Sequence, residues 1–155
     1  MPYRICKTFE IENGHMLSKH PDLCKFPHGH SRKVEIVLEA DTLDQNEMVC
    51  DFKAFKETLL EYLKTLDHAI CVNTQDSNFK QLKDAFGDRV VAFEAVDPTT
   101  EVMAKTIHDV LKTKLAAYAA NLATRYPLRS SVRVVKVRLW ETSCSWAEYF
   151  QNPDD

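Results

Sequence analysis

The alternation of hydrophobic and polar positions predicts four β-strands in this chain. Residues 31–40 are the clearest case, because aliphatic residues stand at every second position and glutamates lie between them. This period of two is typical of a strand with one face on a core and the other in water. Residues 3–13 alternate more loosely and are expected to form the first strand, and residues 131–142 and 146–150 the last two.

Two longer segments have the three- and four-residue spacing of an amphipathic helix. Residues 52–66 place their apolar side chains on one stripe, and Asp51 is the expected N-cap. A second stripe covers residues 103–118 and follows the run Asp-Pro-Thr-Thr-Glu at 97–101, which has the composition of a helix start. Residues 73–96, between these helices, are expected to form an excursion with a short helix and a small strand.

These elements predict an α+β fold, a four-stranded antiparallel sheet with two helices packed on one face. A chain of 155 residues is the size of one domain, and we expect that domain to span residues 1–155. A net charge of −3 offers no basic surface for nucleic acid, and no apolar run is long enough to cross a membrane. The N-terminus lacks the apolar centre of a signal peptide, so we expect a cytoplasmic protein. Five widely spaced cysteines indicate neither a disulfide framework nor a zinc finger.

The histidines at the start of the second strand are the candidate metal ligands. His28 and His30 are two residues apart, so on a strand both imidazoles point to the same side, and Gly29 between them leaves room. His15, at the end of the first strand, can join them through a hairpin-like connection. Three histidines with an open fourth position form a catalytic zinc arrangement. An isolated His-x-His pair is also compatible with ordinary surface or core histidines.

Other segments accompany this pair in a recognisable order. Cys24 lies four residues before His28, Asp67-His68 follows the first helix, Pro-Thr-Thr-Glu opens the second, and Glu-Thr ends the third strand. In order and spacing these segments resemble the 6-pyruvoyl-tetrahydropterin synthase / 6-carboxytetrahydropterin synthase family. The resemblance covers roughly residues 3–150.

The resemblance assigns three groups of residues to a pterin site. The zinc ligands would be His15, His28 and His30. The catalytic residues would be Cys24, as general base, with Asp67 and His68, the histidine as proton carrier. The residues beside the pterin ring would be Glu141, Thr99 and Thr100. From the local sequence alone, Glu141 is equally compatible with an exposed strand end paired to a basic neighbour.

The resemblance also implies an assembly, the tunnelling fold, in which the subunits form a barrel-like ring. We therefore expect a homo-oligomer, a trimer or hexamer, with active sites between subunits. Cys24 and the Asp67-His68 pair of one site would then come from different chains. A cluster of basic residues could hold a triphosphate or could consist of ordinary solvated charges: Lys19, Lys25, Arg32 and Lys33.

The implied substrate is 7,8-dihydroneopterin triphosphate, a small anionic pterin. The gap of three residues between Cys24 and His28 resembles the branch that forms 6-carboxy-5,6,7,8-tetrahydropterin for queuosine and other deazapurines. The alternative product is 6-pyruvoyl-tetrahydropterin, formed by elimination of triphosphate. A third branch replaces this cysteine by glutamate. A non-catalytic zinc- or pterin-binding relative is the alternative of another class, and the joint presence of Cys24, Asp67 and His68 argues against it.

The chain departs from the family pattern at several places. Ile11 stands where an aromatic residue is often found, and Asn13-Gly14 where small alanines are common. Arg32 stands two residues after His30, where an aromatic residue is frequent. Residues 73–96 are longer than in compact members, an insertion that could line the pocket.

Overall fold

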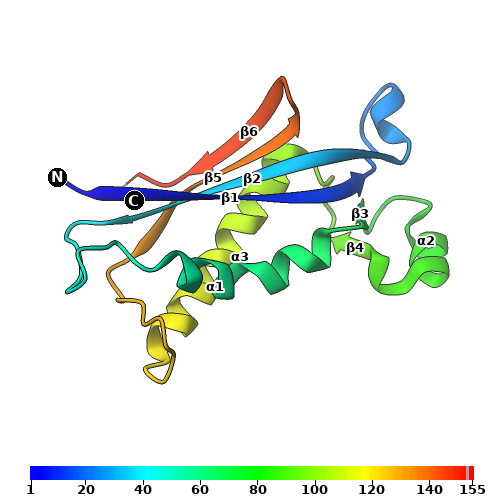
Figure 1. Ribbon diagram of the computed structural model, residues 1–155. Helices are drawn as coiled ribbons and strands as arrows, with labels where there is room; N and C mark the ends of the chain where they lie inside the picture. Colours follow the sequence, from blue (N-terminus) through cyan, green and yellow to red (C-terminus); the bar gives the residue numbers. More distant parts are fainter. Residues whose placement is uncertain (153) are drawn as a thin grey trace.

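The computed structural model describes residues 1–152 and 154–155 and shows one curved sheet with helices beneath it (Figure 1). In chain order the elements are β1 (Tyr3–His15), the 3₁₀ turn η1 (Leu23–Lys25), β2 (His28–Ala40), α1 (Phe52–Leu66), β3 (Ala69–Asn73), α2 (Phe79–Phe86), the 3₁₀ turn η2 (Gly87–Arg89), β4 (Val90–Phe93), α3 (Thr100–Ala120), β5 (Arg133–Thr142) and β6 (Ser145–Phe150). The four expected strands and both expected long helices are present.

The six strands are ordered β4-β3-β1-β2-β5-β6. The four long strands pair antiparallel, β1 with β2, β2 with β5 and β5 with β6. At the other edge β3 pairs parallel with β1, and β4 pairs parallel with β3. The α+β class is confirmed, but the prediction of a four-stranded antiparallel sheet is wrong, because the sheet has six strands and is mixed.

The missed strand β3 explains the error. Ala69–Asn73 follows α1 after only two residues and is almost wholly buried, and only its last residue is polar, so no alternation marks a period of two. A short apolar run of this kind cannot be distinguished by periodicity from the end of a helix. The second added strand, β4, belongs to the 73–96 segment, where a short helix and a small strand were expected and α2 and β4 are found.

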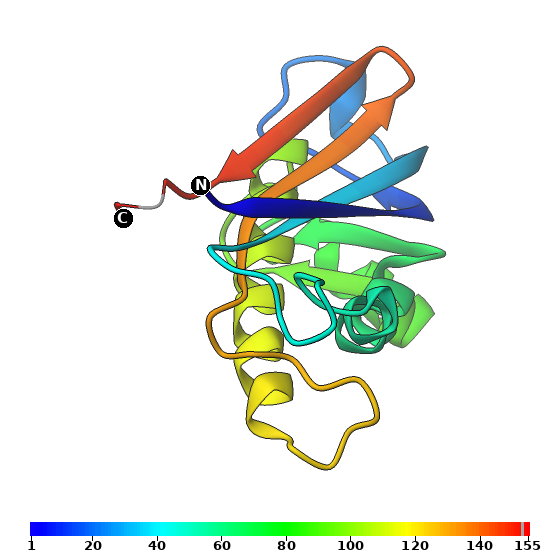
Figure 2. The ribbon, with the colours of Figure 1, turned by 60° about the vertical axis from the view of Figure 1, so that its left-hand side comes forward.

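The two long helices cover one face of the sheet (Figure 2). Asp51 caps α1 by accepting a hydrogen bond from the Lys53 amide, as expected. The core between helices and sheet is formed by aliphatic and aromatic side chains that are at most 1% exposed, including Val34, Ile36, Leu38, Phe55, Leu59, Ile107, Leu111 and Leu139. The side chains of β2 that face the core thus stand at even-numbered positions, such as Val34, Ile36 and Leu38. His28, at the start of the strand, also has an even number and is expected on the same face.

Among the described residues, no helix combines the length and apolar character needed to cross a membrane.

Candidate metal centre

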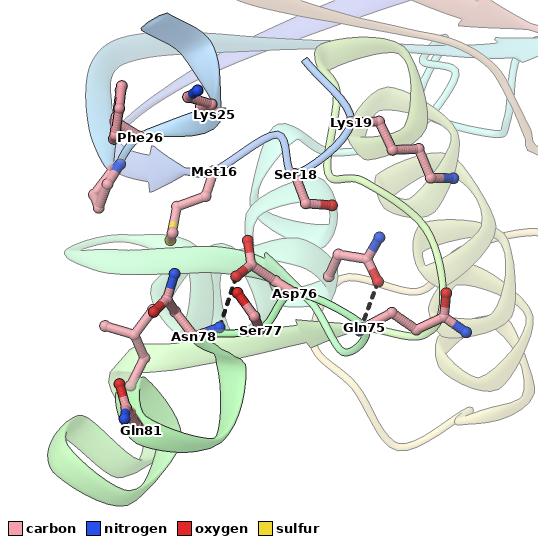
Figure 3. Close-up of a pocket in the computed structure, with 13 residues that line it drawn as sticks. Met16, Ser18, Lys19, Lys25, Phe26, Gln75, Asp76, Ser77, Asn78 and Gln81 are labelled. Carbon is pink, nitrogen blue, oxygen red and sulfur yellow. Dashed lines mark hydrogen bonds between the residues drawn. The ribbon is translucent and has the colours of Figure 1, made fainter. Parts of the chain in front are cut away.

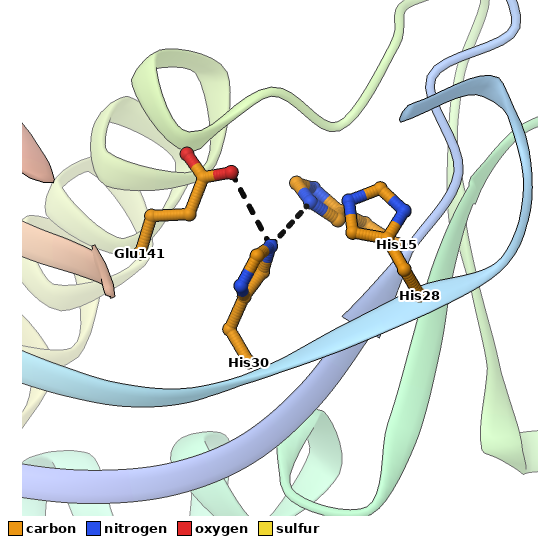
Figure 4. A group of neighbouring side chains, drawn as sticks. All are labelled: His15, His28, His30 and Glu141. Atoms are coloured by element: carbon orange, nitrogen blue, oxygen red, sulfur yellow. Dashed lines mark hydrogen bonds and ion pairs between the residues drawn. The ribbon is translucent and has the colours of Figure 1, made fainter. Parts of the chain in front are cut away.

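The pairing of β1 and β2 brings the three predicted zinc ligands together. His15 lies directly opposite His28, and Asn13 lies opposite His30. Side chains alternate across a strand, so His28 and His30 face the side on which the helices pack, and His15 faces it from β1. Together with Glu141 of β5, these histidines offer four ligand atoms that all lie within 4.8 Å of one another (Figure 4).

Backbone carbonyls hold two of the imidazoles in the form that a metal needs. The Nδ1 atom of His15 is 2.8 Å from the carbonyl oxygen of Pro98, and Nδ1 of His28 is 2.8 Å from that of Phe26. Since a carbonyl only accepts, both Nδ1 atoms carry the proton and both Nε2 atoms keep a free lone pair. The Nε2 atom of His28 is buried and has no hydrogen-bond partner, as expected of a nitrogen aimed at a cation.

The spacing and protonation of the imidazoles also fit a metal. Nε2 of His15 lies 3.2 Å from Nε2 of His30, close to the separation of about 3.3 Å between two nitrogens on a tetrahedral zinc with bonds of about 2.0–2.1 Å. Burial lowers the pKa of His15 to about 4, and it also lowers the pKa of His30. Neutral imidazoles are the metal-binding form. The four side chains therefore can bind a divalent metal ion.

Glu141 is the fourth member of the cluster. One carboxylate oxygen is 3.2 Å from Nε2 of His30, and the other accepts a 2.9 Å hydrogen bond from the Thr100 hydroxyl. Burial by itself would raise the pKa of Glu141, but the Thr100 bond and the charges of the neighbouring histidines and Arg32 outweigh burial and keep this pKa below its ordinary value. Glu141 is thus an anion beside the imidazoles.

The two threonines at the start of α3 have different contacts. Thr99 is the N-cap, and its hydroxyl accepts a hydrogen bond from the Val102 amide. Thr100 is buried and connects Glu141 to Arg32, whose Nη1 donates to the Thr100 hydroxyl over 3.2 Å. In this single chain Thr100, rather than Thr99, reaches the cluster.

Asp67 and His68 lie on the other side of β1. Asp67 accepts a hydrogen bond from the Glu12 amide and is 3.0 Å from Nδ1 of His68. His68 has a positive φ of 57°, is 74% exposed at its side chain, and lines a pocket of about 410 Å³ together with Glu12, Gly14 and His30. Among the described residues, neither Asp67 nor His68 belongs to the group of ligand atoms that lie within 4.8 Å of one another, so the pair does not join the histidine cluster of its own chain.

Cys24 lies in η1, in the connection between β1 and β2, and is half-buried. Among the described residues, the hydrogen bonds of Asp67 and His68 do not reach it. The structure of one chain thus brings the metal ligands together with Glu141 and Thr100, and leaves the two halves of the expected acid–base relay apart.

Asp97, a buried aspartate, holds in place the connection between β1 and β2 that contains Cys24. The sequence indicated this residue only as part of a helix start. The Asp97 carboxylate is 6% exposed and accepts hydrogen bonds from the Ser18 hydroxyl (2.6 Å), the Lys19 amide (2.8 Å) and the Asn73 side chain (2.9 Å). The segment 97–100 also contacts two members of the cluster, since Pro98 orients His15 and Thr100 donates to Glu141. Its Asp-Pro sequence gave no signal for these distant contacts.

A cavity of about 750 Å³ opens between the β1–β2 connection and residues 73–82 (Figure 3). Lys19 and Lys25 line it from one side, and amide and hydroxyl side chains of the 73–96 segment line it from the other. The other two cations that were grouped with these lysines lie elsewhere. Arg32 is buried, and Lys33 alternates to the opposite face of β2.

Comparison with known sequences defines the class of protein. The profile of the 6-pyruvoyl tetrahydropterin synthase family matches residues 4–152, and the chain belongs to this family. It is 32% identical over 167 residues to the 6-carboxy-5,6,7,8-tetrahydropterin synthase of Aquifex aeolicus, an alignment that covers 96% of this chain and 98% of the relative. It is 29% identical over 157 residues to a putative enzyme of the same name from Pyrococcus horikoshii, with 94% and 88% covered.

Solved structures agree on the fold. An uncharacterized protein of Wolinella succinogenes superposes with a TM-score of 0.77 at 21% identity, covering 98% of this chain and 99% of the other. The 6-pyruvoyl tetrahydropterin synthase of Plasmodium vivax superposes with a TM-score of 0.69 at 17% identity, with the same coverage.

Proposed function

We propose that this protein is a zinc-dependent lyase that converts 7,8-dihydroneopterin triphosphate into 6-carboxy-5,6,7,8-tetrahydropterin, within a cytoplasmic queuosine or deazapurine pathway. The observation that carries the proposal is the convergence of three histidine Nε2 atoms in a chain whose relatives are named 6-carboxytetrahydropterin synthase. The short spacing between Cys24 and His28 supports the same branch of the family.

The metal is proposed to be zinc, because three neutral imidazoles with an open fourth position are the donor set of catalytic zinc sites. Zinc held by His15, His28 and His30 supplies a Lewis acid for the oxygens of the substrate side chain. The chain's own contribution is orientation, since Pro98 and Phe26 accept the Nδ1 protons and keep the Nε2 lone pairs free.

Glu141 is proposed to anchor the pterin ring. A carboxylate can accept two parallel hydrogen bonds from the N–H edge of a 2-amino-4-oxo pterin. Thr100 donates to one carboxylate oxygen and so limits the rotation of the group. Glu141 is close enough to His30 to serve instead as a metal ligand, and the variant Glu141→Gln separates these roles. Retention of zinc with weaker pterin binding is expected from an anchor.

Proton transfer is proposed to use groups of two subunits. Cys24 acts as the base near the substrate side chain, and a protonated His68, stabilised by Asp67 at 3.0 Å, carries the proton. The large exposure of His68 and its position across β1 from the metal ligands support a homo-oligomer, a trimer or hexamer, in which His68 of one subunit completes the site of the next.

The proposed reaction balances with one molecule of water. The substrate and water yield 6-carboxytetrahydropterin, acetaldehyde and triphosphate, and the side-chain carbon that becomes the carboxylate supplies the electrons that reduce the ring. The second candidate is 6-pyruvoyl-tetrahydropterin synthase, which releases triphosphate and keeps all three side-chain carbons. The name of the matching family supports that reading.

The experiment is a product assay on the purified, zinc-loaded protein. We expect acetaldehyde and 6-carboxytetrahydropterin, identified by mass, after incubation with dihydroneopterin triphosphate. A pyruvoyl product without acetaldehyde would establish the second candidate. Full zinc occupancy without turnover would refute both lyase proposals for this substrate and favour a non-catalytic zinc- or pterin-binding relative.

A further inference from the structure

Arg32 is a charged side chain buried next to the metal centre. It lies on β2 two residues after His30, with the same parity, so it points to the face that holds the histidines. It is 1% exposed. Burial of a guanidinium is strongly unfavourable unless a partner compensates its charge, so the contacts of Arg32 are informative.

These contacts join Arg32 to the metal ligands and to Glu141. Its Nη1 donates to the Thr100 hydroxyl over 3.2 Å, and Thr100 in turn donates to Glu141. Its Nη2 lies 3.3 Å from Nδ1 of His15. Since that Nδ1 already donates its proton to Pro98, the contact is not a hydrogen bond, and the cation lies directly behind the imidazole ligand.

Arg32 also has no carboxylate in direct contact among the described residues. Its Nε is buried without a partner, and Glu141, the acidic member of the cluster, is reached only through Thr100. The positive charge is therefore incompletely compensated. A divalent cation at the histidines would experience this charge at close range in a largely dry environment.

We propose that Arg32 is a positioning residue of the metal centre, with two effects. By donating to Thr100 it forces that hydroxyl to donate to Glu141, which fixes the orientation of the carboxylate. Its charge weakens metal binding and at the same time stabilises negative charge that develops on a ligand at the metal. This inference rests on the proposed zinc site, but its metal-affinity part does not depend on which reaction the protein catalyses.

The two effects predict opposite changes in one variant. Arg32→Met keeps much of the volume and removes the charge, so we expect it to bind zinc at least about tenfold more tightly, as measured by competition with a chromophoric chelator. We expect its kcat with dihydroneopterin triphosphate to fall at least about tenfold. Loss of a merely structural side chain would weaken zinc binding and lower turnover together.

Two further variants complete the design. Arg32→Lys keeps the charge and should retain wild-type zinc affinity within about threefold. Arg129→Met is the matched control, because Arg129 is a part-buried guanidinium that bonds Thr42 and the Val49 carbonyl beyond the far end of β2. It should leave zinc affinity and kcat unchanged. If circular dichroism shows that Arg32→Met is unfolded, Arg32→Gln replaces it, with the same expectation for zinc.

Each outcome has a defined reading. Unchanged or weaker zinc binding in the charge-free variant, beside a wild type that binds zinc, would overturn the role of Arg32 and leave the proposed function standing. A wild type that binds zinc but turns over no substrate would reject the proposed reaction, and the affinity comparison would still decide the role of Arg32. A wild type without zinc affinity would overturn both.

Discussion

Removal of the Asp97 carboxylate should loosen the connection that holds Cys24. Asp97→Ala leaves three donors without their acceptor, at Ser18, Lys19 and Asn73. Water can reach Ser18 and Lys19, which are exposed, but Asn73 is 1% exposed and its amide would remain unpaired. An unpaired buried donor costs about 1–3 kcal/mol, and hydrogen bonds to a charged group contribute about 1.5–3 kcal/mol. We expect a loss of about 2–4 kcal/mol in the free energy of unfolding.

The assay is urea denaturation at fixed protein concentration, together with amide hydrogen exchange of residues 16–26. Exchange in that segment should accelerate more than exchange in α1. Asp44→Asn is the matched control, because Asp44 also accepts two backbone amides but lies in a half-buried turn far from the site, and it should cost less than about 1 kcal/mol. Equal stability of Asp97→Ala and wild type, with unchanged exchange at 16–26, would refute the reasoning.

The pH dependence gives a second check on Asp97. Burial alone would raise its pKa, but the hydrogen bonds from Ser18, Asn73 and Lys19 outweigh burial and hold the pKa below its ordinary value. A lowered folded-state pKa means that the stabilisation is complete above the unfolded-state pKa of about 3.9 and is lost as the pH falls through the folded-state value. The stability difference between wild type and Asp97→Asn should be constant near neutral pH and shrink below about pH 4.

Four further variants test the site and the fold. His28→Ala should lose zinc, whereas Cys24→Ala should keep zinc and lose turnover. Metal analysis of both proteins tests this prediction, and loss of zinc from the Cys24→Ala protein would contradict the role of Cys24 as a base. A mixture of refolded Cys24→Ala and Asp67→Asn subunits should regain activity that neither variant has alone, because mixed oligomers contain some sites with both wild-type groups. If oligomers that are shown to be mixed recover no activity, both groups of a site come from one chain. Glu39→Gln should lower the free energy of unfolding in urea by about 1.5–3 kcal/mol, because the buried Glu39 carboxylate accepts hydrogen bonds from Arg4 and Arg133. A smaller loss than in an Asp41→Asn control would show that these pairs contribute little.

Hydrophobic periodicity predicted the strands and helices that have one buried face and one exposed face. The alternation at 31–40 and the stripe at 52–66 both correspond to elements with one buried side. It missed β3, because four of its five residues are buried and the strand therefore shows no contrast between two faces. The sheet is mixed because that strand pairs parallel with its neighbours, so the hydrophobic periodicity could not predict the topology of the sheet.

The sequence likewise predicted some features of the site and not others. The parity of His28 and His30 is a local property of a strand, and their shared face could be predicted from spacing alone. The contacts of Arg32 and Asp97 span 68 and 78 positions of the chain, to Thr100 and Lys19, and depend on how α3 packs against the sheet. Arg32 shares the parity of Val34 and Ile36, so its inward direction could be predicted from spacing. The groups that it contacts there could not, because they lie far away in the sequence.

All three imidazoles lie between residues 15 and 30, on one antiparallel hairpin whose strands are neighbours in the sequence. During synthesis the amino-terminal part of a chain leaves the ribosome first, so the nitrogen donors are complete long before Glu141 is made. A metal ion that meets this nascent hairpin finds three donors and would fix the register of β1 against β2. Later segments would then add Pro98, which orients His15, and Glu141, the fourth member of the cluster.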